Sequence, residues 1–333
     1  MKNVLVTGAA GFIGSHVVAD LLQNTGAKVR AMLRPGEDRR SLAGMDVEIV
    51  EADMLDREGV KKAVSGMDTV FNLAAIYSIW MKDWKPLYEV NLQGTRNVLW
   101  AALAAGVGRV VHTSSIAAIG IAPGKALSDE TTPFNQYGLG NHYVLSKYLS
   151  QQEALEFARN GLDVVVVNPA FPFGRNDRGP TPTGKLIIDI VRGVNRFDFD
   201  GGINVVDVAD VARGHVLAAQ KGKTGECYIL GNENVTMERF GAMVREAGGI
   251  TRKNFPAMPV FIVKIAAWAM TWWANHVSGK TPMSTPVEVS YASQNLYFSN
   301  EKAKRELGLA FTPVRESIAR SIQWFSENGY LKK

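Results

Sequence analysis

A glycine-rich turn near the start of the chain restricts the possible folds more than any other feature. The apolar run 4–6 is followed by Gly8, Gly11 and Gly14 at three-residue spacing, and then by apolar residues at helical spacing. In a dinucleotide site, a strand, such a turn and a helix place the phosphates on free N–H groups at the positive end of the helix. A glycine-rich turn without a ligand is the alternative, but the flanking strand and helix patterns favour a nucleotide cofactor.

Short apolar stretches alternate with helical patterns along the chain. The strand candidates are residues 3–6, 29–33, 47–50, 69–73, 109–113, 163–167 and 226–230, and the helix candidates are residues 13–23, 57–64, 94–105 and 137–159. Strands separated by helices of this length need right-handed crossovers, which produce a parallel sheet covered on both faces. We therefore predict an α/β fold with a Rossmann-type doubly wound parallel sheet.

The pattern changes after Pro169. Residues 171–184 contain three prolines and three glycines, which predict a long irregular loop. Beyond this loop, shorter and less regular elements predict a smaller mixed α/β lobe that binds the substrate. The predicted division is a dinucleotide-binding domain at residues 1–170 and a substrate lobe at 171–333, with the strand near 226–230 returning to the first sheet.

Composition excludes several other classes. The net charge is +5, but no run of five like charges occurs, which favours a solvated surface over a nucleic-acid site. The single cysteine, Cys227, lies among apolar residues and is expected in the core without a disulfide. The histidines show no metal-ligand spacing, so no metal is expected. No basic and apolar leader precedes the first strand, which predicts a cytoplasmic protein.

An apolar segment at residues 260–274 contains Trp268, Trp272 and Trp273. Lys264 interrupts it, and its length falls short of the ~20 residues that span a membrane, so no span is expected. Trp268 and Trp272 share one helical face, which favours packing against the protein. A wall of a substrate pocket and a helix at a membrane surface are the alternatives.

Tyr143 and Lys147 lie four residues apart in a helical pattern and therefore share one face. A nearby ammonium group stabilises a phenolate, so we expect Lys147 to lower the pKa of Tyr143 and make it a proton donor and acceptor near neutral pH. An ordinary surface pair is the alternative.

A cluster of hydroxyl residues follows the predicted strand 109–113. Ligands bind at the carboxyl ends of the strands in open parallel sheets, so Ser115 could hydrogen-bond a substrate oxygen beside Tyr143. Thr113 and Ser114 are the competing hydroxyls, and capping of a turn is their alternative role. With a nicotinamide cofactor, these groups would form a hydride-transfer site.

The complete set of motifs resembles the extended short-chain dehydrogenase/reductases of the NAD-dependent epimerase/dehydratase superfamily. The matching elements, spread over roughly residues 1–235, are Thr7-Gly8-x-x-Gly11-x-x-Gly14, Asp53, Asn72-Leu73-Ala74-Ala75, Val90-Asn91-x-x-Gly94-Thr95, Thr113-Ser114-Ser115, Tyr143-x-x-x-Lys147 and Asn168-Pro169. Residues 180–184 and 228–231 look like those of the dihydroflavonol-reductase-like branch, and of proteins described as hopanoid-associated sugar epimerases.

The resemblance implies a role for each matching position. Tyr143 would be the acid/base, Ser115 would polarise the carbonyl, and Lys147 would hold the ribose hydroxyls. Around the cofactor, the expected contacts are Gly8, Gly11, Phe12, Ile13 and Gly14 at the pyrophosphate, Asp53 and Met54 at the adenine, Ala74 and Ala75 at the nicotinamide ribose, and Asn168 and Pro169 at the nicotinamide or substrate. Relatives often form homodimers through two helices of the first domain, so the resemblance makes a homodimer one candidate, although the sequence itself does not specify the oligomeric state.

The end of the second strand bears on the choice of cofactor. NAD sites usually place an acidic residue there, whereas an arginine accommodates the 2′-phosphate of NADP. Here Arg34 follows the strand, with Arg39 and Arg40 close behind. Glu37 and Asp38 weaken this argument without reversing it. We predict NADP, with NAD as the alternative.

The substrate class depends on positions 203–204 and on three aromatic stretches. Sugar-modifying relatives typically carry an Arg-Asp pair where this chain has Ile203 and Asn204, although Arg175, Arg178, Lys185 or Arg192 could replace it. Aromatic stretches at 77–84, 171–173 and 268–273 favour a less polar carbonyl compound, and we expect Tyr77, Asn168 and Phe171 among its contacts. We predict an NADPH-dependent reductase of a ketone or aldehyde. A nucleotide-sugar epimerase or dehydratase that retains its cofactor is one alternative, and a non-catalytic NADP-binding regulator is another.

Overall fold

The computed structural model describes residues 1–194, 200–251 and 258–332. Its larger sheet has seven strands in the order β3-β2-β1-β4-β5-β6-β9, and every neighbouring pair is parallel. The strands are β1 (Asn3–Thr7), β2 (Lys28–Leu33), β3 (Glu48–Glu51), β4 (Thr69–Asn72), β5 (Arg109–Thr113), β6 (Val164–Pro169) and β9 (Cys227–Leu230). This confirms the Rossmann-type sheet, and β9 joins it beside β6 as the pattern at 226–230 predicts.

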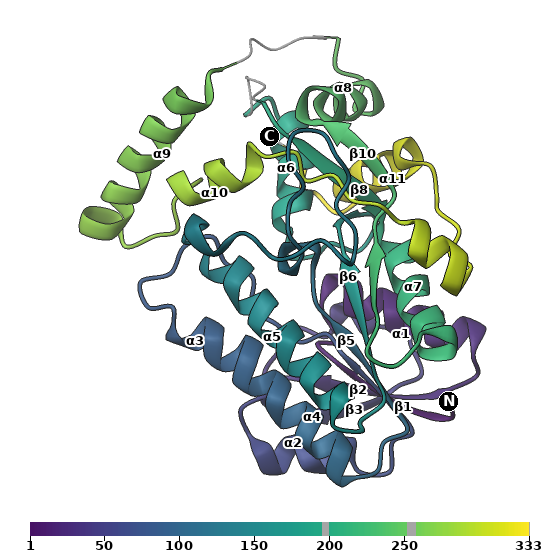
Figure 1. Cartoon of the computed structure of the whole chain (residues 1–333). Helices are drawn as coiled ribbons and strands as arrows, with labels where there is room; N and C mark the ends of the chain where they lie inside the picture. Colours follow the sequence, from purple (N-terminus) through teal and green to yellow (C-terminus); the bar gives the residue numbers. More distant parts are fainter. Residues whose placement is uncertain (195–199, 252–257, 333) are drawn as a thin grey trace.

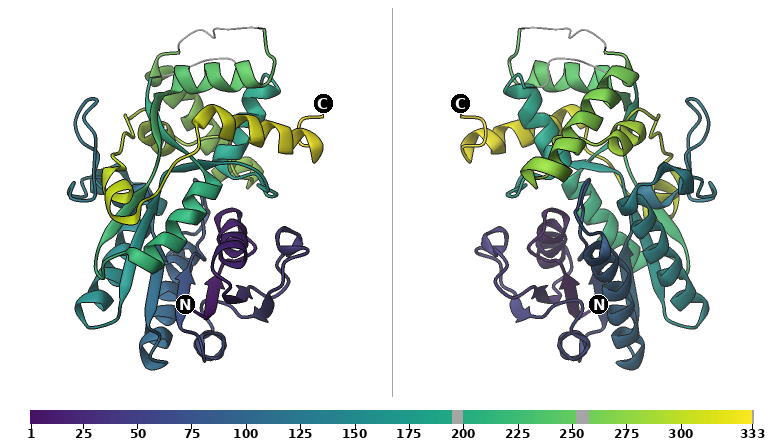
Figure 2. Two further views of the ribbon diagram at one scale, coloured as in Figure 1. Left: turned by 90° about the vertical axis from the view of Figure 1, so that its right-hand side faces the viewer. Right: turned by 90° about the vertical axis from the view of Figure 1, so that its left-hand side faces the viewer.

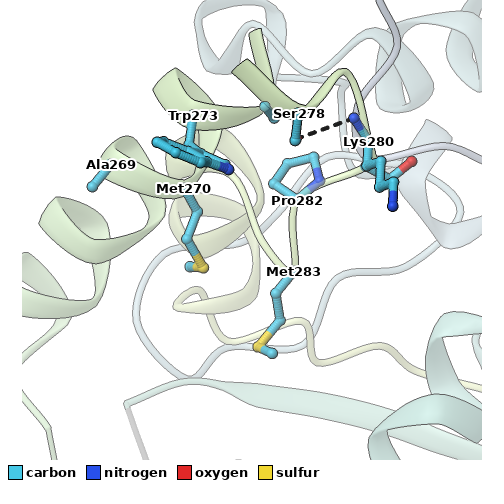
Figure 3. A pocket seen from close by; sticks show the side chains of 9 residues that line it. Ala269, Met270, Trp273, Ser278, Lys280, Pro282 and Met283 are labelled. Carbon is cyan, nitrogen blue, oxygen red and sulfur yellow. Dashed lines mark hydrogen bonds between the residues drawn. The ribbon is translucent and has the colours of Figure 1, made fainter. Parts of the chain in front are cut away.

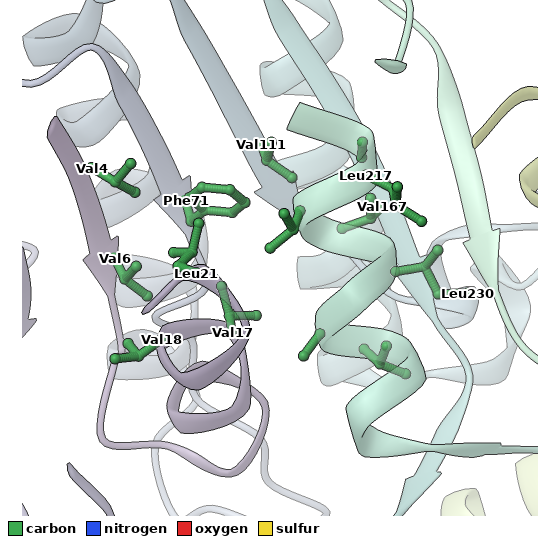
Figure 4. Packing of buried hydrophobic residues seen from close by; sticks show 14 of the residues in the cluster. Val4, Val6, Val17, Val18, Leu21, Phe71, Val111, Val167, Leu217 and Leu230 are labelled. Atoms are coloured by element: carbon green, nitrogen blue, oxygen red, sulfur yellow. The ribbon is translucent and has the colours of Figure 1, made fainter. Parts of the chain in front are cut away.

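Helices cover both faces of this sheet, as Figures 1 and 2 show. Helices α1 (Phe12–Asn24) and α7 (Val208–Lys221) pack on one face against side chains such as Val6, Phe71 and Val167 (Figure 4). The opposite face carries α2 (Arg57–Val64), α4 (Thr95–Ala104) and α5 (His142–Arg159), which pack against alternate residues of the same strands, including Leu5 and Val70. Because successive strand residues point to opposite faces, a continuous apolar strand serves both layers.

A smaller mixed lobe lies beyond the carboxyl ends of these strands (Figures 1 and 2). Its sheet has the order β10-β8-β7, in which β10 is antiparallel and β7 parallel to β8. The elements are β7 (Phe171–Phe173), β8 (Gly202–Asp207), β10 (Glu233–Thr236), α6 (Pro182–Val191), α8 (Met237–Ala247), α10 (Pro286–Ala292) and α11 (Val314–Glu327). β7 follows β6 after one residue, so the lobe begins directly at the edge where ligands bind. The domain limits at 170 and 171 remain a prediction.

Three predicted elements need correction. Residues 171–184 are not one irregular loop, because they contain β7 and the start of α6. The helix predicted from Tyr137 begins at His142, because Gly140 has a φ of +69° and Asn141 caps the helix by accepting the N–H of Val144 at 3.1 Å. Helical structure before Thr95 also begins earlier than predicted, with α3 (Lys85–Tyr88) and a π-helical turn (Glu89–Gly94).

Helix α9 (Val260–Trp273) lies beside α10 at the periphery of the lobe (Figure 1). The expectation that Trp268 and Trp272 pack against the protein is wrong, because they are 62% and 47% exposed. The inward side of the helix is occupied by small residues such as Ala267 instead. Across the described residues, no helix combines the length and apolar character needed to cross a membrane.

Candidate active site

The glycine turn has the close contacts that its sequence predicts. Gly8 has a φ of +63°, and a β-carbon there would lie 2.9 Å from the Cα of Ala74. A β-carbon on Gly14 would lie 2.1 Å from the carbonyl oxygen of Gly8, so α1 can approach β1 this closely only with glycine. Gly11 is the N-cap of α1 and has no side chain to occupy the N–H groups of the first turn, which includes residues 12–13. The turn therefore fits a pyrophosphate in shape and polarity.

Thr7 fixes this turn to the next strand of the sheet. Its hydroxyl donates to Oδ1 of Asn72 at 3.0 Å and accepts from the N–H groups of Leu73 and Ala74 at 3.0 and 3.1 Å. Ala74 is therefore held beside the glycine turn, and the exposed Ala75 follows it. Both alanines lie where a dinucleotide leaving the turn would pass.

The predicted adenine contacts follow strand β3. Asp53 accepts the N–H of Leu55 through Oδ1 at 2.8 Å, and the carbonyl of the buried Met54 accepts from Nδ2 of Asn97 at 2.9 Å. A β-carbon on Gly94 would lie 2.9 Å from the Met54 side chain, so α4 begins directly against this segment. The segment is well fixed, and its contact with adenine remains a prediction.

Arg34 is the first residue after β2, and its side chain is exposed. Its backbone N–H donates to Oε2 of Glu37 at 2.9 Å. Arg40 binds Asp38 through Nε and Nη2, at 2.9 and 2.7 Å. Nη2 of Arg39 lies 3.9 Å from Oε1 of Glu51. Within the described part of the chain, the Arg34 guanidinium differs from the other two because it forms no ion pair.

Tyr143 lies in the first turn of α5 with its hydroxyl buried beside Ser115. A hydrogen bond from Ser115 lowers the pKa of the phenol, but burial outweighs it and raises the pKa of Tyr143 to about 12. The expectation that Lys147 lowers the pKa of Tyr143 is therefore wrong for this structure. The phenol keeps its proton at neutral pH and can donate it.

Lys147 lies one helical turn after Tyr143 and is only 4% exposed. Its Nζ donates to the backbone carbonyl of Thr113 at 2.8 Å, which joins α5 to the end of β5. Burial lowers the pKa of Lys147 to about 8. Burial and the charge of Lys147 also lower the pKa of His112 to about 3, so this histidine is neutral.

The structure distinguishes the three hydroxyls that follow β5. Oγ1 of Thr113 lies 2.9 Å from Nε2 of His215, whose Nδ1 lies 2.7 Å from the carbonyl of Val211. The ring must donate to that carbonyl, so Thr113 donates to the ring and points away from Tyr143. Oγ of Ser114 is buried and has no hydrogen-bond partner within the described residues. Ser115 is the hydroxyl that contacts Tyr143.

Asn168 holds the backbone of Ser115 in place. Its Nδ2 donates to the carbonyl of Ser115 at 2.8 Å and to Oε1 of Gln151 at 2.7 Å. Asn168 is fully buried at the end of β6, next to the buried Pro169, and thus has no exposed atom for a substrate in this structure. Ser115 is fixed a second time because its Oγ accepts the N–H of Ala117 at 3.1 Å.

Aromatic side chains lie against the Tyr143 ring or close to it. The ring of Tyr77 packs edge-on against Tyr143, with centroids 4.6 Å apart and planes at 62°. Phe171 and Tyr291 pack against one apolar cluster that also contains Ile116, next to Ser115. Burial raises the pKa of Tyr291, and the neighbouring Tyr143 adds to this rise, so the two phenols lie near each other. The structure therefore brings together the predicted residues Tyr77 and Phe171 and adds Tyr291.

A buried carboxyl group was missed by sequence reasoning. Oε2 of Glu288 is buried without a hydrogen-bond partner among the described residues, and burial raises the pKa of Glu288 to about 7. Its charge also raises the pKa of Tyr77, so it lies near the aromatic side chains. The pattern Thr285-x-x-Glu288 would suggest a capping box, and Thr285 does accept the N–H of Glu288 at 3.1 Å. The Glu288 carboxyl, however, forms a hydrogen bond with Ser284 instead of with the N-cap backbone, and its Oε2 stays without a partner among the described residues.

Asn91 links the segment before Tyr77 to helix α5. Its Oδ1 accepts the N–H of Ile76 at 2.7 Å, and its Nδ2 donates to the Ile76 carbonyl at 2.9 Å and to Oγ of Ser146 at 3.0 Å. The residue before Tyr77 is thus fixed to α5. Helix capping, the simple alternative for this asparagine, is not its role here.

The positions that hold an Arg-Asp pair in sugar-modifying relatives point inward. Ile203 is 5% exposed and Asn204 is fully buried, with its Nδ2 donating to Oδ1 of Asn234 at 2.7 Å. Neither residue can contact a nucleotide pyrophosphate in this arrangement.

Comparisons with known proteins show the family of this chain. The model of the NAD dependent epimerase/dehydratase family matches residues 4–231. A Synechocystis sp. protein named "Putative dihydroflavonol 4-reductase" is 37% identical over 333 residues, covering 98% of this chain and 95% of that protein. "Sterol demethylase protein B" of Methylococcus capsulatus is 33% identical over 329 residues, covering 99% of this chain and 100% of that protein.

A solved structure described as a nucleoside-diphosphate-sugar epimerase, PA4631 from Pseudomonas aeruginosa, matches with a TM-score of 0.82 and 27% identity, covering 99% of both chains. Reductase and epimerase names thus both occur among similar proteins. Because one family model covers more than half of the chain and relatives match along nearly their whole length, the chain belongs to the NAD-dependent epimerase/dehydratase family, the extended short-chain dehydrogenase/reductases, and is an enzyme of that family.

Proposed function

We propose that this enzyme uses NADPH to reduce a ketone or aldehyde group on a largely apolar substrate. The observation that carries the proposal is the buried Tyr143 hydroxyl, which is hydrogen-bonded to Ser115 and lies near the aromatic side chains of Tyr77 and Tyr291. A protonated phenol is the form that acts as an acid, and aromatic neighbours favour a substrate with little charge near the reacting carbonyl. The relatives named as a reductase and as a sterol demethylase protein support this direction.

Ser115 and Tyr143 would both bind the substrate oxygen. Oγ of Ser115 accepts a backbone N–H, and its own hydrogen, which is donated to Tyr143 in this structure, would turn to the carbonyl oxygen when a substrate binds. A bound nicotinamide supplies the hydride that reduces the carbonyl carbon. Tyr143 donates its phenol proton to the carbonyl oxygen, which yields the alcohol, and regains a proton from solvent. Lys147 and Asn168 act as positioning residues that fix α5 and Ser115.

The glycine turn, the segment 74–75 and Asp53 would hold the dinucleotide. We propose NADP over NAD because the Arg34 guanidinium is exposed at the end of β2 without a carboxylate partner among the described residues. A guanidinium can bind a 2′-phosphate through two hydrogen bonds, whereas it offers nothing comparable to a ribose hydroxyl pair.

A nucleotide-sugar epimerase is the second candidate, because a structure described as such an epimerase matches almost the entire chain. It would require cations that bind a pyrophosphate in the small lobe. Ile203 and Asn204 do not supply them, which makes this candidate weaker. A non-catalytic regulator would not need the buried pair of Tyr143 and Lys147.

The deciding experiment incubates the enzyme and NADPH with ketones, aldehydes and nucleotide sugars, and measures cofactor oxidation and sugar products separately. We expect oxidation of NADPH that matches alcohol formation one for one. Formation of an epimerised sugar without net cofactor loss would instead identify an epimerase. Binding of NADPH without turnover of any compound would support the regulator.

The predicted homodimer remains a proposal. It is supported by Trp100 on α4, which packs against Phe157 on α5 at a centroid distance of 5.0 Å and is still 60% exposed.

A further inference from the structure

Helix α9 presents large side chains to solvent and small ones to the protein. Its outer face consists of residues at helical spacing that are 47% to 64% exposed, namely Phe261, Ile265, Trp268 and Trp272. Its inner side includes Ala267, and Ala274 follows on the same side, both almost fully buried. A surface helix of a soluble domain normally shows the opposite arrangement. An apolar face of this size marks an interaction surface.

The apolar surface continues past the end of the helix. Trp273, Val277 and Met283 are 56%, 54% and 63% exposed. Between α9 and the segment 278–283 lies a hollow of about 420 Å³, and Figure 3 shows Met270, Trp273, Pro282 and Met283 around it. The surface thus offers both protruding rings and a recess lined by flexible apolar side chains.

The segment that forms this surface contains basic residues and no acidic one. Residues 258–287 contain Lys264, His276 and Lys280 but neither aspartate nor glutamate. Lys82 reaches the same place, because its Nζ lies 3.0 Å from the position of a β-carbon on Gly279. Tryptophan together with lysine is typical of segments that lie in the headgroup region of a membrane.

We propose that the surface formed by α9 and residues 274–283 docks this enzyme on an anionic lipid membrane. The helix would lie in the plane of the interface, with Trp268 and Trp272 among the upper acyl chains and Lys280 at the headgroups. A second copy of the chain is a poorer occupant. A symmetric contact would bring the cations of one copy against those of the other, without acidic residues from this segment to pair them.

The docking surface is connected to the candidate active site. Nε1 of Trp80 donates to Oδ1 of Asn275 at 2.8 Å, which ties the segment 77–84 to the end of α9. Tyr77, at the start of that segment, packs against Tyr143. An apolar substrate could therefore pass from lipid to the site along this side; this last step rests on the proposed function, whereas docking does not.

The test is co-sedimentation of the full chain, without cofactor or substrate, with two kinds of vesicle. We expect binding to equimolar phosphatidylcholine and phosphatidylglycerol, and weaker binding to phosphatidylcholine alone or at high salt. The double variant Trp268→Ser/Trp272→Ser should reduce partitioning roughly tenfold or more. Trp100→Ser is the matched control, since Trp100 is 60% exposed on α4 and should leave partitioning unchanged.

A charge variant tests the second part of the proposal. Lys280→Glu should weaken binding to the anionic vesicles roughly fivefold or more but leave binding to phosphatidylcholine unchanged, and Lys28→Glu serves as its control. Circular dichroism and melting temperatures establish that each variant is folded. The proposal is overturned if the wild-type chain does not bind anionic vesicles, or if Trp100→Ser reduces binding as much as the α9 variant. A lipid-free dimer that dissociates in the α9 variant would identify a second copy as the occupant instead.

Discussion

Nζ of Lys147 donates to the backbone carbonyl of Thr113 at 2.8 Å, which joins the helix that carries Tyr143 to the strand that leads into Ser115. Tyr143 lies one turn before Lys147, and Ser115 lies two residues after Thr113. This hydrogen bond therefore helps to fix the distance between the proposed proton donor and the hydroxyl beside it, together with the bonds that hold Ser115. Because this bond uses a backbone carbonyl, it places no requirement on the side chain at position 113.

Replacing Tyr143 by phenylalanine removes the proposed proton donor and leaves the ring in place. We expect kcat for carbonyl reduction to fall roughly 10²- to 10⁴-fold, whereas the Kd for NADPH should change little. Tyr148→Phe is the matched control, because this tyrosine lies on the same helix and stacks on Phe134 at 4.1 Å rather than facing Ser115. Wild-type turnover by the Tyr143 variant would refute the assignment.

The two neighbouring serines should respond differently to alanine. Ser115→Ala removes a hydrogen bond to the reacting oxygen and should lower kcat roughly 10²-fold. Ser114→Ala removes a buried hydroxyl that has no partner among the described residues, so activity should stay within a few-fold and the melting temperature should not fall. Steady-state kinetics and thermal melts measure both effects. Equal losses in the two variants would contradict the choice of Ser115.

Much of the nucleotide domain could be predicted from the sequence, because its information is local. The turn at Gly8, Gly11 and Gly14 and the alternating apolar strands specify the large sheet residue by residue. Even there, the limits of helices depend on single residues, because the positive φ of Gly140 ends the preceding turn and α5 begins only at His142. The direction of the pKa shift of Tyr143 could not be predicted, because it depends on burial by distant segments.

The small lobe was much less predictable for a physical reason. Its side of the site is assembled from short elements such as α10, whose seven residues carry no distinctive period. Tyr291 approaches Tyr143, and Glu288 approaches Tyr77, only through tertiary packing. The sequence position of Glu288 instead suggests a local capping role. The exposed face of α9 illustrates the same limit, because helical spacing reveals a shared face but not which side the protein covers.

Arg34→Asp tests the choice of cofactor. Losing a charge-assisted hydrogen bond to the 2′-phosphate should weaken NADPH binding roughly 10- to 100-fold, whereas NADH binding should stay unchanged or improve. Arg40→Asp is the control, since Arg40 already binds Asp38. Fluorescence titration with both cofactors measures the two constants. Equal weakening for NADPH and NADH would remove the support for NADP.

Glu288→Gln tests whether the buried carboxyl faces the substrate. The pKa of Glu288 is raised to about 7 from an ordinary 4.5, so its proton is retained below neutrality and lost above it. We expect KM of the wild type to change as pH rises through 7, because a hydrogen-bond donor becomes an anion, and we expect the glutamine variant to lose this dependence. Glu238→Gln, at an exposed position on α8, is the control. Identical pH profiles of KM in wild type and Glu288→Gln would exclude a substrate contact.

The same substitution has a consequence for stability that does not depend on substrate. Between pH 4.5 and 7 the folded protein holds a proton that the unfolded chain has released, so the contribution of Glu288 to stability falls as pH rises through this window and stays lost above it. Glutamine does not ionise, so at pH 8 the free energy of unfolding of the variant should exceed that of the wild type by on the order of 1–3 kcal/mol. This difference should shrink towards pH 5. Urea unfolding at both pH values measures this. A variant that is less stable than the wild type at pH 8 would show that the carboxylate is paired when charged, contrary to its unpartnered Oε2.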